Sequence, residues 1–232
     1  MIMSEFAYEL RTIRTMEDLT GLARDLGFLP FFQNHIRGFS IDEATPLEVW
    51  EEYLGLGPWL WRDEIAAEKK CIYGKFFGKK TGYVSADWFP YLANYRRDGY
   101  DFDARYDDGL ARYEDKRIYE IIEKLGPITS KDLRKEAGVD SKKASAFEGI
   151  LTRLQMQTYV VPIDFIFSRD PDGNKKYSYG TTVYDLPERW LGKELVTSQY
   201  SADPLDSFEK MVSHLMLELP DIDRESVEKL LK

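Results

Sequence analysis

The chain has 232 residues, of which 43% are hydrophobic and 31% are charged, and its formal net charge is -9. This composition is typical of a soluble globular protein with one large or two small domains. No stretch approaches the roughly eighteen apolar residues of a membrane-spanning helix, and acidic residues stand where a signal peptide is apolar, so we expect a cytoplasmic protein with no membrane partner.

Cysteine and histidine are scarce. Cys71 is the only cysteine, and His35 and His214 are the only histidines. One chain therefore cannot assemble a disulfide framework or a Cys/His zinc site, and we expect no metal and no cofactor. Because no third partner accompanies these three residues, they also predict no nucleophile arrangement, and the sequence identifies no catalytic residue.

The negative charge is unevenly distributed along the chain. Residues 1–115 contain 14 Lys and Arg against 21 Asp and Glu, residues 116–200 contain 14 against 12, and residues 201–232 contain 4 against 8. These counts make up the 32 basic and 41 acidic residues of the chain. Only the middle block is net positive, so it is where we look first for an anionic partner.

Capping signals predict two helices in the N-terminal part. The segment 15–27 has Thr15 as N-cap, Asp18 in the capping-box position and a terminal glycine. The residues that it is predicted to bury are Met16, Leu19, Leu22 and Leu26. The segment 45–55 repeats these signals, with Thr45 as N-cap and Pro46 at the first helical position.

A hairpin and another helix follow. Aromatic and β-branched runs flank the glycines and lysines at 78–82, which predicts a hairpin over residues 71–85. Ser85 is the expected cap of the next helix. The polar, glycine-containing stretch 96–109 is the expected boundary between two domains.

The order of elements after this boundary predicts a winged helix. Helices are expected over 115–126, from Thr129 to Gly138, and from Asp140 or Ser141 onward, and strands over 158–167 and 176–184. The residues that the third helix is expected to bury are Ala144, Phe147, Ile150, Leu151 and Leu154. We therefore expect a mostly helical α+β fold in which one or more winged-helix units accompany small β-hairpins.

The tail is predicted to form two more helices separated by Pro220. The first has an apolar stripe made of Leu205, Phe208, Met211, Val212, Leu215 and Leu219. We expect this stripe to pack on the parent domain, with a dimer contact as the alternative, so the chain is a monomer or a weak dimer. The predicted domains are 1–110, 111–200 and the extension 201–232.

A winged helix places the N-terminal residues of its third helix in the major groove of DNA, while flanking cations hold phosphates. The residues predicted to contact DNA on this basis are Lys142, Lys143, Thr152 and Arg153 of the third helix and Arg169, Lys175 and Lys176 of the wing. The alternative is that these side chains form an ordinary solvated face whose charge is cancelled by Glu148, Asp170 and Asp172.

Several segments resemble the AlkZ and YcaQ family of bacterial winged-helix DNA glycosylases, and in particular its AlkZ-related branch. They are "GPITSKDLRKEAG", "LTRLQMQTYVV", "VYDLPERWLG" and, upstream, "IYGKFFGKKTGYVSADWFPYLANYRRDG". The resemblance covers residues 15–200 and adds nothing for the tail. It implies winged-helix-like units around a DNA-binding cleft and, in active members, excision of an alkylated or cross-linked base.

The chain departs from this family at the catalytic motif. Active members carry Gln-x-Asp or Gln-x-Gln near the N-terminus, whereas the matching stretch here, "LGFLPFFQNHI", has Pro30 and Phe32 at the polar positions. Neither side chain can hold and activate water for glycosidic cleavage. Gln33 and Asn34, just downstream, are possible substitutes, and we interpret the literal Gln-x-Gln at 155–157 as the polar end of the third helix.

Three functions remain open on the sequence alone. The first is a DNA-binding relative of these glycosylases that lacks the usual catalytic motif. The second is a protein-interaction module that retains the fold. The third is an active DNA glycosylase, a hydrolase, with a rearranged catalytic site.

Overall fold

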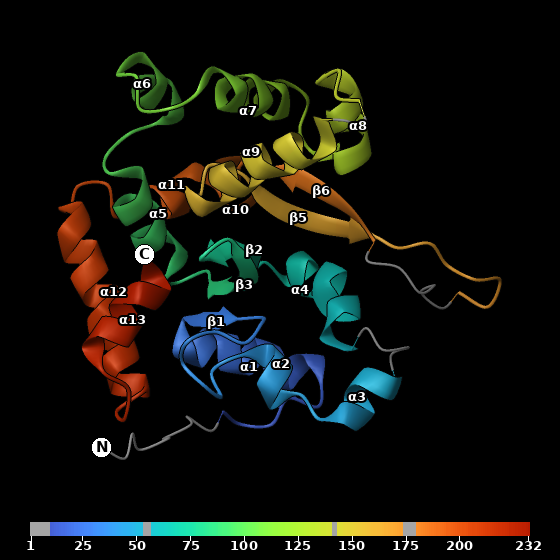
Figure 1. The fold of residues 1–232 in the computed structure, drawn as a ribbon, viewed down its shortest axis with the longest axis vertical. Coiled ribbons are helices and arrows are strands. Elements are labelled where there is room, and N and C mark those ends of the chain that lie inside the picture. Colours follow the sequence, from blue (N-terminus) through green and yellow to red (C-terminus); the bar gives the residue numbers. More distant parts are fainter. Residues whose placement is uncertain (1–9, 53–56, 141–142, 174–179) are drawn as a thin grey trace.

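The computed structural model describes residues 10–232 except 53–56, 141–142 and 174–179. Within them, helices surround two small antiparallel sheets of three strands each (Figure 1). The prediction of a mostly helical α+β fold is confirmed. In the part of the chain that the structure describes, no helix has the length and apolar character needed to cross a membrane.

The first sheet contains the predicted hairpin. Its strands, in the spatial order β1-β3-β2, are β1 (Phe28–Pro30), β2 (Cys71–Phe77) and β3 (Lys80–Ser85). Gly78 and Lys79 form the connecting turn, and both have positive φ, as two-residue hairpin turns require. The lysines of this turn are therefore presented at the end of the hairpin.

Short helices precede the hairpin in the chain and pack around its sheet. They are α1 (Met16–Leu26), α2 (Ile41–Ala44), α3 (Leu47–Glu52), the 3₁₀ helix η1 (Gly57–Trp61) and α4 (Arg62–Glu68). The capping box of Thr15 and Asp18 is present, as predicted. Thr45, by contrast, ends α2, where its hydroxyl donates to the carbonyl of Ile41 at 2.7 Å, and α3 begins at Leu47.

The segment after the hairpin is more ordered than a polar connection. Helix α5 (Phe89–Arg97) starts without a side-chain cap, because the chain makes a turn first and Trp88, not Ser85, is the N-cap residue. The expectation that Ser85 caps this helix is therefore wrong. Helix α6 (Phe102–Asp107) lies within the predicted boundary and places Phe102 in a buried cluster.

The second sheet forms part of a helix-rich unit in the middle of the chain. Its elements are α7 (Tyr113–Leu125), β4 (Ile128–Thr129), α8 (Ser130–Glu136), α9 (Ala144–Met156), β5 (Val161–Ile166) and β6 (Thr181–Asp185), with the strands in the order β4-β6-β5. Thr129 caps α8 as predicted, and Gly173 in the turn between the strands has a φ of 88°.

The C-terminal segment consists of helices. They are α10 (Pro187–Leu191), α11 (Lys193–Val196), α12 (Pro204–Glu218) and α13 (Arg224–Leu231). Helix α12 packs along α5, and α13 packs on β2, so the tail lies against the parent fold as expected (Figure 1). Leu205 was expected to pack on the parent domain but is 66% exposed, because it lies at the first turn of α12, beyond the packed residues.

The buried residues form two hydrophobic clusters. The first combines α1, the first sheet and α5 with α12 and α13, and the second combines α7, α8 and α9. The strand β5 connects them, since Val161 and Phe165 belong to the first cluster, whereas the preceding Tyr159 and Val160 belong to the second. The sites described below lie where these two clusters meet.

Candidate functional site

The face of α9 that carries Thr152, one of the predicted DNA contacts, is partly covered by the β2–β3 hairpin. The backbone N–H of Lys75 in β2 donates to Oε1 of Gln155 at 3.2 Å, and its Nζ donates to Oγ1 of Thr152 at 2.9 Å. The N–H of Lys79 lies 3.3 Å from Sδ of Met156. The C-terminal half of α9 therefore packs on β2, which places Thr152 in the contact between α9 and β2 and leaves the N-terminal end of α9 accessible.

Arg153 forms an ion pair inside the molecule. Its Nε and one Nη bind both oxygens of Asp115 at 2.5–3.2 Å, and the Asp115 side chain is only 4% exposed. Hydrogen bonding to this carboxylate is the main reason why the pKa of Arg153 is raised. The guanidinium therefore joins α9 to the start of α7, and a carboxylate already compensates its charge.

Two of the remaining predicted DNA contacts are exposed in the structure. Lys143 is exposed at the N-cap of α9, where its backbone N–H donates to Asp140 at 3.1 Å. Arg169 is exposed between β5 and β6 and donates to the carbonyl of Gly173 at 2.7 Å. The other three, Lys142, Lys175 and Lys176, lie outside the described residues.

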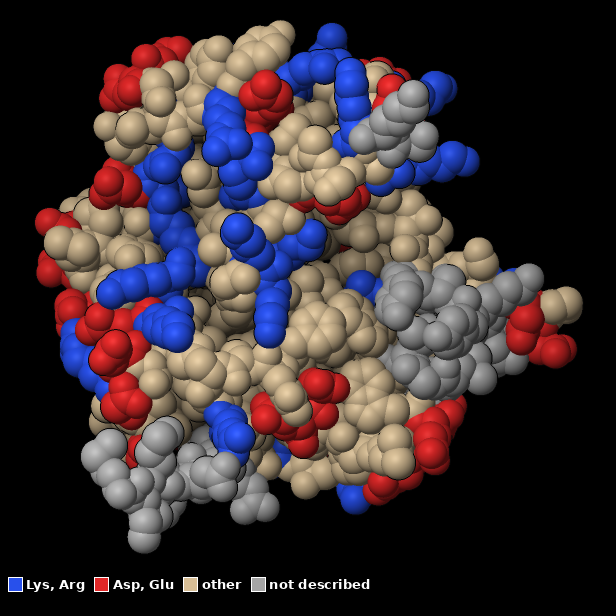
Figure 2. Space-filling model, in the orientation of Figure 1, with Lys and Arg blue, Asp and Glu red and all other residues tan. Residues whose placement is uncertain are grey.

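Basic side chains nevertheless gather on one face of the molecule. Figure 2 shows Lys and Arg side chains running over α7, α9, the β2–β3 hairpin and the end of the chain, with acidic side chains more frequent toward the edges. We call one group of basic residues the basic band and define it by its contacts as Lys75, Lys79, Lys80, Arg96, Arg105 and Lys232. Contacts with α9, or the walls of a shared cavity, connect all of them except Lys80, which follows Lys79 directly.

Sequence reasoning assigned none of these six residues to DNA. The hairpin lysines were interpreted only as turn residues, and Arg96 and Arg105 fell in the supposed connection. The run of three lysines in "GKFFGKK" was the available signal. Its meaning depends on α9, which is about 75 residues away in the chain and packs on the hairpin.

Arg96 is one of two adjacent arginines that hold the turn after α9. Its guanidinium donates to the carbonyl oxygens of Met156 at 2.8 Å, Phe76 at 2.6 Å and Leu231 at 2.9 Å. These carbonyls come from α9, β2 and α13. Arg96 therefore ties three separate parts of the chain to the end of α5.

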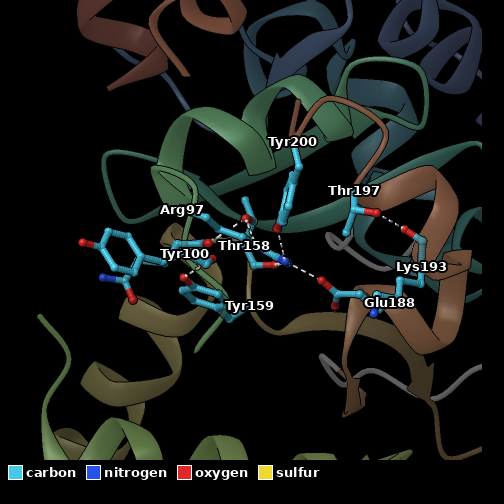
Figure 3. Close-up of polar contacts among 9 residues, drawn as sticks. Arg97, Tyr100, Thr158, Tyr159, Glu188, Lys193, Thr197 and Tyr200 are labelled. Carbon is cyan, nitrogen blue, oxygen red and sulfur yellow. Dashed lines mark hydrogen bonds and ion pairs between the residues drawn. The ribbon is translucent and has the colours of Figure 1, made fainter. Parts of the chain in front are cut away.

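Arg97 binds the same turn at Thr158 and reaches Glu188 and Tyr200 (Figure 3). It donates to the carbonyl of Thr158 at 2.6 Å and to the hydroxyl of Tyr200 at 2.7 Å, and it forms an ion pair with Glu188. Its guanidinium also lies 4.7 Å from the ring centre of Tyr159. Thr158 has a φ of 63°, an unusual conformation for a β-branched residue, so these bonds hold a strained turn.

A cavity of about 560 Å³ opens beside Arg97. Its lining residues are Arg97, Gly99, Asp101, Tyr119, Glu123, Leu186, Glu188, Lys193, Thr197 and Tyr200. Burial raises the pKa of the Tyr200 phenol, so this hydroxyl stays protonated at neutral pH and donates or accepts hydrogen bonds. The cavity offers polar groups, but its arginine charge is already matched by a carboxylate.

The stretch expected at the family's catalytic position has little free polar chemistry. Pro30 is buried at the end of β1, and Phe32 packs beside Trp59 with ring centres 5.6 Å apart. The Asn34 amide fixes its own loop, donating to the carbonyl of Phe39 at 2.7 Å and accepting from the N–H of Ile36 at 2.8 Å. Of the two proposed substitutes, Gln33 alone is exposed.

Cysteine and the histidines occupy structural positions. Burial raises the pKa of the Cys71 thiol to about 12, so it is not a thiolate at neutral pH. The ring of His214 stacks on Trp88 with centres 4.3 Å apart, and Nε2 of His35 lies 2.8 Å from the carbonyl of Ser226. Over the described ranges, no group of three or more His, Cys, Asp or Glu residues is placed to hold a metal ion.

Comparison with protein families gives one match. A family model described as "AlkZ related" matches residues 13–232. The match extends through α12 and α13, beyond the residues that carry the resemblance seen in the sequence. No curated protein and no solved structure matches the chain.

Proposed function

The chain belongs to the AlkZ-related family, and from this premise we propose that it binds DNA through its basic band. The family is described as related to AlkZ. The resemblance of this chain to AlkZ implies action on DNA. The finding that supports the proposal most directly is the gathering of Lys and Arg on one face of a chain whose net charge is -9 (Figure 2). Such a separation of charge favours a polyanionic partner on that face.

We further propose that residues 111–200 form a winged helix. The chain order α7-β4-α8-α9-β5-β6 and the strand order β4-β6-β5 support this assignment. In such a unit the N-terminal end of α9 faces DNA, and it is the end that the hairpin leaves uncovered. Lys143 and Arg169 are then the described cations of this unit that we propose contact DNA, and Lys142, Lys175 and Lys176 remain sequence-based candidates outside the described residues.

Base excision is the activity that we propose has been lost. Pro30 and Phe32 supply no group that can activate water, and the amide of Asn34 is engaged within its loop. Incubating the protein with an alkylated duplex should leave no abasic sites above those of a protein-free control. Abasic sites that form at a rate proportional to protein concentration would overturn this part of the proposal.

DNA binding is tested by reversing charge at two ends of one strand. Lys79→Glu/Lys80→Glu changes the hairpin turn, and Lys69→Glu/Lys70→Glu makes the same change just before β2. The pairs are matched, since Lys80 donates to the carbonyl of Gln33 at 2.8 Å and Lys69 to that of Trp190 at 2.7 Å. With a duplex of about 20 base pairs, we expect the first variant to bind at least about tenfold more weakly. The slope of log K against the logarithm of salt concentration should become shallower by the equivalent of about two phosphate contacts.

The control variant should bind within about twofold of the wild type. Two results contradict the proposal. One is a wild-type affinity that does not change with salt, because neutralising phosphates releases counterions. The other is equal affinity of the hairpin variant and the wild type, which favours the protein-interaction alternative.

A further inference from the structure

A second cavity, of about 470 Å³, opens at the C-terminal end of α9, beside Arg96, Arg105 and Lys232 of the basic band. Its lining residues are Tyr95, Arg96, Asp98, Arg105, Met156, Gln157, Pro204, Leu205 and Lys232. Three of them are cations and one, Asp98, is a carboxylate. Nζ of Lys232 forms an ion pair with Glu228 at 3.0 Å. The positive charge beside the cavity therefore comes mainly from the two arginines.

Arg96 carries a charge that no acidic group of the described residues pairs with directly. Its three close acceptors are neutral carbonyl oxygens, and within the described residues no carboxylate lies at ion-pair distance from it. Burial therefore lowers the pKa of Arg96 to about 10, and only Tyr95 opposes this effect. The neighbouring Arg97 differs, since Glu188 neutralises it.

Unfilled hydrogen-bonding groups surround the same cavity. Nε of Arg96, Nε of Arg105 and Oε1 of Gln157 are buried without a hydrogen-bond partner. Buried donors without acceptors are costly, and a charged donor more so. Within the described residues neither guanidinium forms an ion pair, so two positive charges beside one cavity lack an acceptor that carries negative charge.

We propose that this cavity binds a phosphate group between Arg96 and Arg105. Guanidinium groups form charge-assisted hydrogen bonds with phosphate oxygens, and both side chains are half-buried and line the cavity. Arg105 can offer two parallel N–H donors, whereas Arg96 contributes its charge, since both hydrogens of its Nη2 bind the carbonyl oxygens of Phe76 and Leu231. The volume accommodates a phosphate with its substituents. The group can come from free phosphate or from the backbone of a nucleic acid, and the second source rests on the proposed function.

Inorganic phosphate is the first probe. The arginine Nε–Hε signals of the ¹⁵N-labelled protein are followed by NMR during titration with phosphate, and with chloride at the same ionic strength. We expect the signals of Arg96 and Arg105 to shift and saturate with phosphate alone. Arg105→Gln should weaken this binding at least about fivefold, whereas Arg24→Gln, on the exposed side of α1, should leave it unchanged.

Arg105→Lys keeps the charge and tests the geometry, because lysine lacks the planar pair of donors. It should bind phosphate more weakly than the wild type and more strongly than Arg105→Gln. Arg96 is left intact, since its bonds to three carbonyls make a folding defect the expected result of its removal.

Duplex DNA is the second probe and identifies the source. If Arg105→Gln weakens duplex binding and lowers the salt dependence by about one phosphate contact, the cavity takes a backbone phosphate. If it binds the duplex normally but loses inorganic phosphate, the cavity takes free phosphate. Phosphate shifts in a wild type that does not bind DNA would reject the proposed function alone, and no response to either probe would overturn the phosphate site.

Discussion

Arg97 and Glu188 form an ion pair that joins α5 to α10, and the arginine side chain is only 3% exposed against 25% for the glutamate. Burial lowers the pKa of Arg97, but Glu188 and Tyr200 outweigh this effect and raise it overall. The strained turn at Thr158 is bound to the same guanidinium. Three segments therefore depend on one charge pair.

Glu188→Gln should lower the free energy of unfolding by about 3 kcal/mol, because it leaves the arginine charge buried without its counter-ion. Urea unfolding at neutral pH measures the difference. Glu194→Gln, an exposed glutamate of α11, is the matched control and should change stability by less than about 0.5 kcal/mol. Equal stabilities of the two variants would show that the pair does not hold α10.

Cys71 should be unreactive in the folded protein. Burial raises the pKa of its thiol to about 12. The thiol of the folded protein therefore remains protonated at every pH below that value. Iodoacetamide at about pH 8 should modify it only after unfolding, as mass spectrometry can show. Rapid alkylation of the native protein would contradict the burial of this residue.

Two glycines should respond in opposite ways to alanine. A Cβ at Gly82 would lie 2.5 Å from the backbone oxygen of Leu29, so Gly82→Ala should destabilise the first sheet by about 2 kcal/mol. Gly21 lies within α1 with nothing within 4 Å of its added Cβ, and Gly21→Ala should stabilise by about 0.5 kcal/mol. Thermal unfolding of both variants decides whether the strand spacing is as described.

The capping box of α1 should depend on pH. The backbone N–H of Arg14, which donates to Asp18 at 3.0 Å, is the main reason why the pKa of this carboxyl is lowered. The stabilisation by Asp18 is therefore present above the ordinary aspartate pKa of about 4, and it is lost as the pH falls through the lowered pKa of Asp18.

Asp18→Ala should accordingly cost about 1 kcal/mol of unfolding free energy at neutral pH, and less once the pH falls below the lowered pKa of Asp18. Glu17→Ala removes an acidic residue from the same turn outside the box and serves as the control. A difference between the two variants that stays constant as the pH falls would exclude the carboxylate as the capping group.

Local signals predicted the elements that local chemistry determines. The cap at Thr15, the cap at Thr129 and the turn at Gly173 each depend on a few neighbouring residues, and all three are present. Ser85 failed because a turn intervenes before α5, and a capping residue cannot be recognised when the helix start is misplaced.

The candidate site depended on contacts between distant segments. Arg153 was predicted to face DNA, but the sequence gives no sign that Asp115 lies buried beside it. Arg96 and Arg97 stand at the edge of a polar stretch that is typical of a linker, and only the packing of α9 and α10 makes them internal. The basic band could not be predicted because its members come from a hairpin, two helices and the end of the chain.

The strand β5 has a consequence for how the protein loses its structure. Val160 lies in the second cluster and the next residue, Val161, lies in the first. Unfolding of one cluster therefore removes packing contacts from the other. Heating should accordingly give one calorimetric peak whose van't Hoff and calorimetric enthalpies agree, and the regions on each side of residue 160 should act as one cooperative unit.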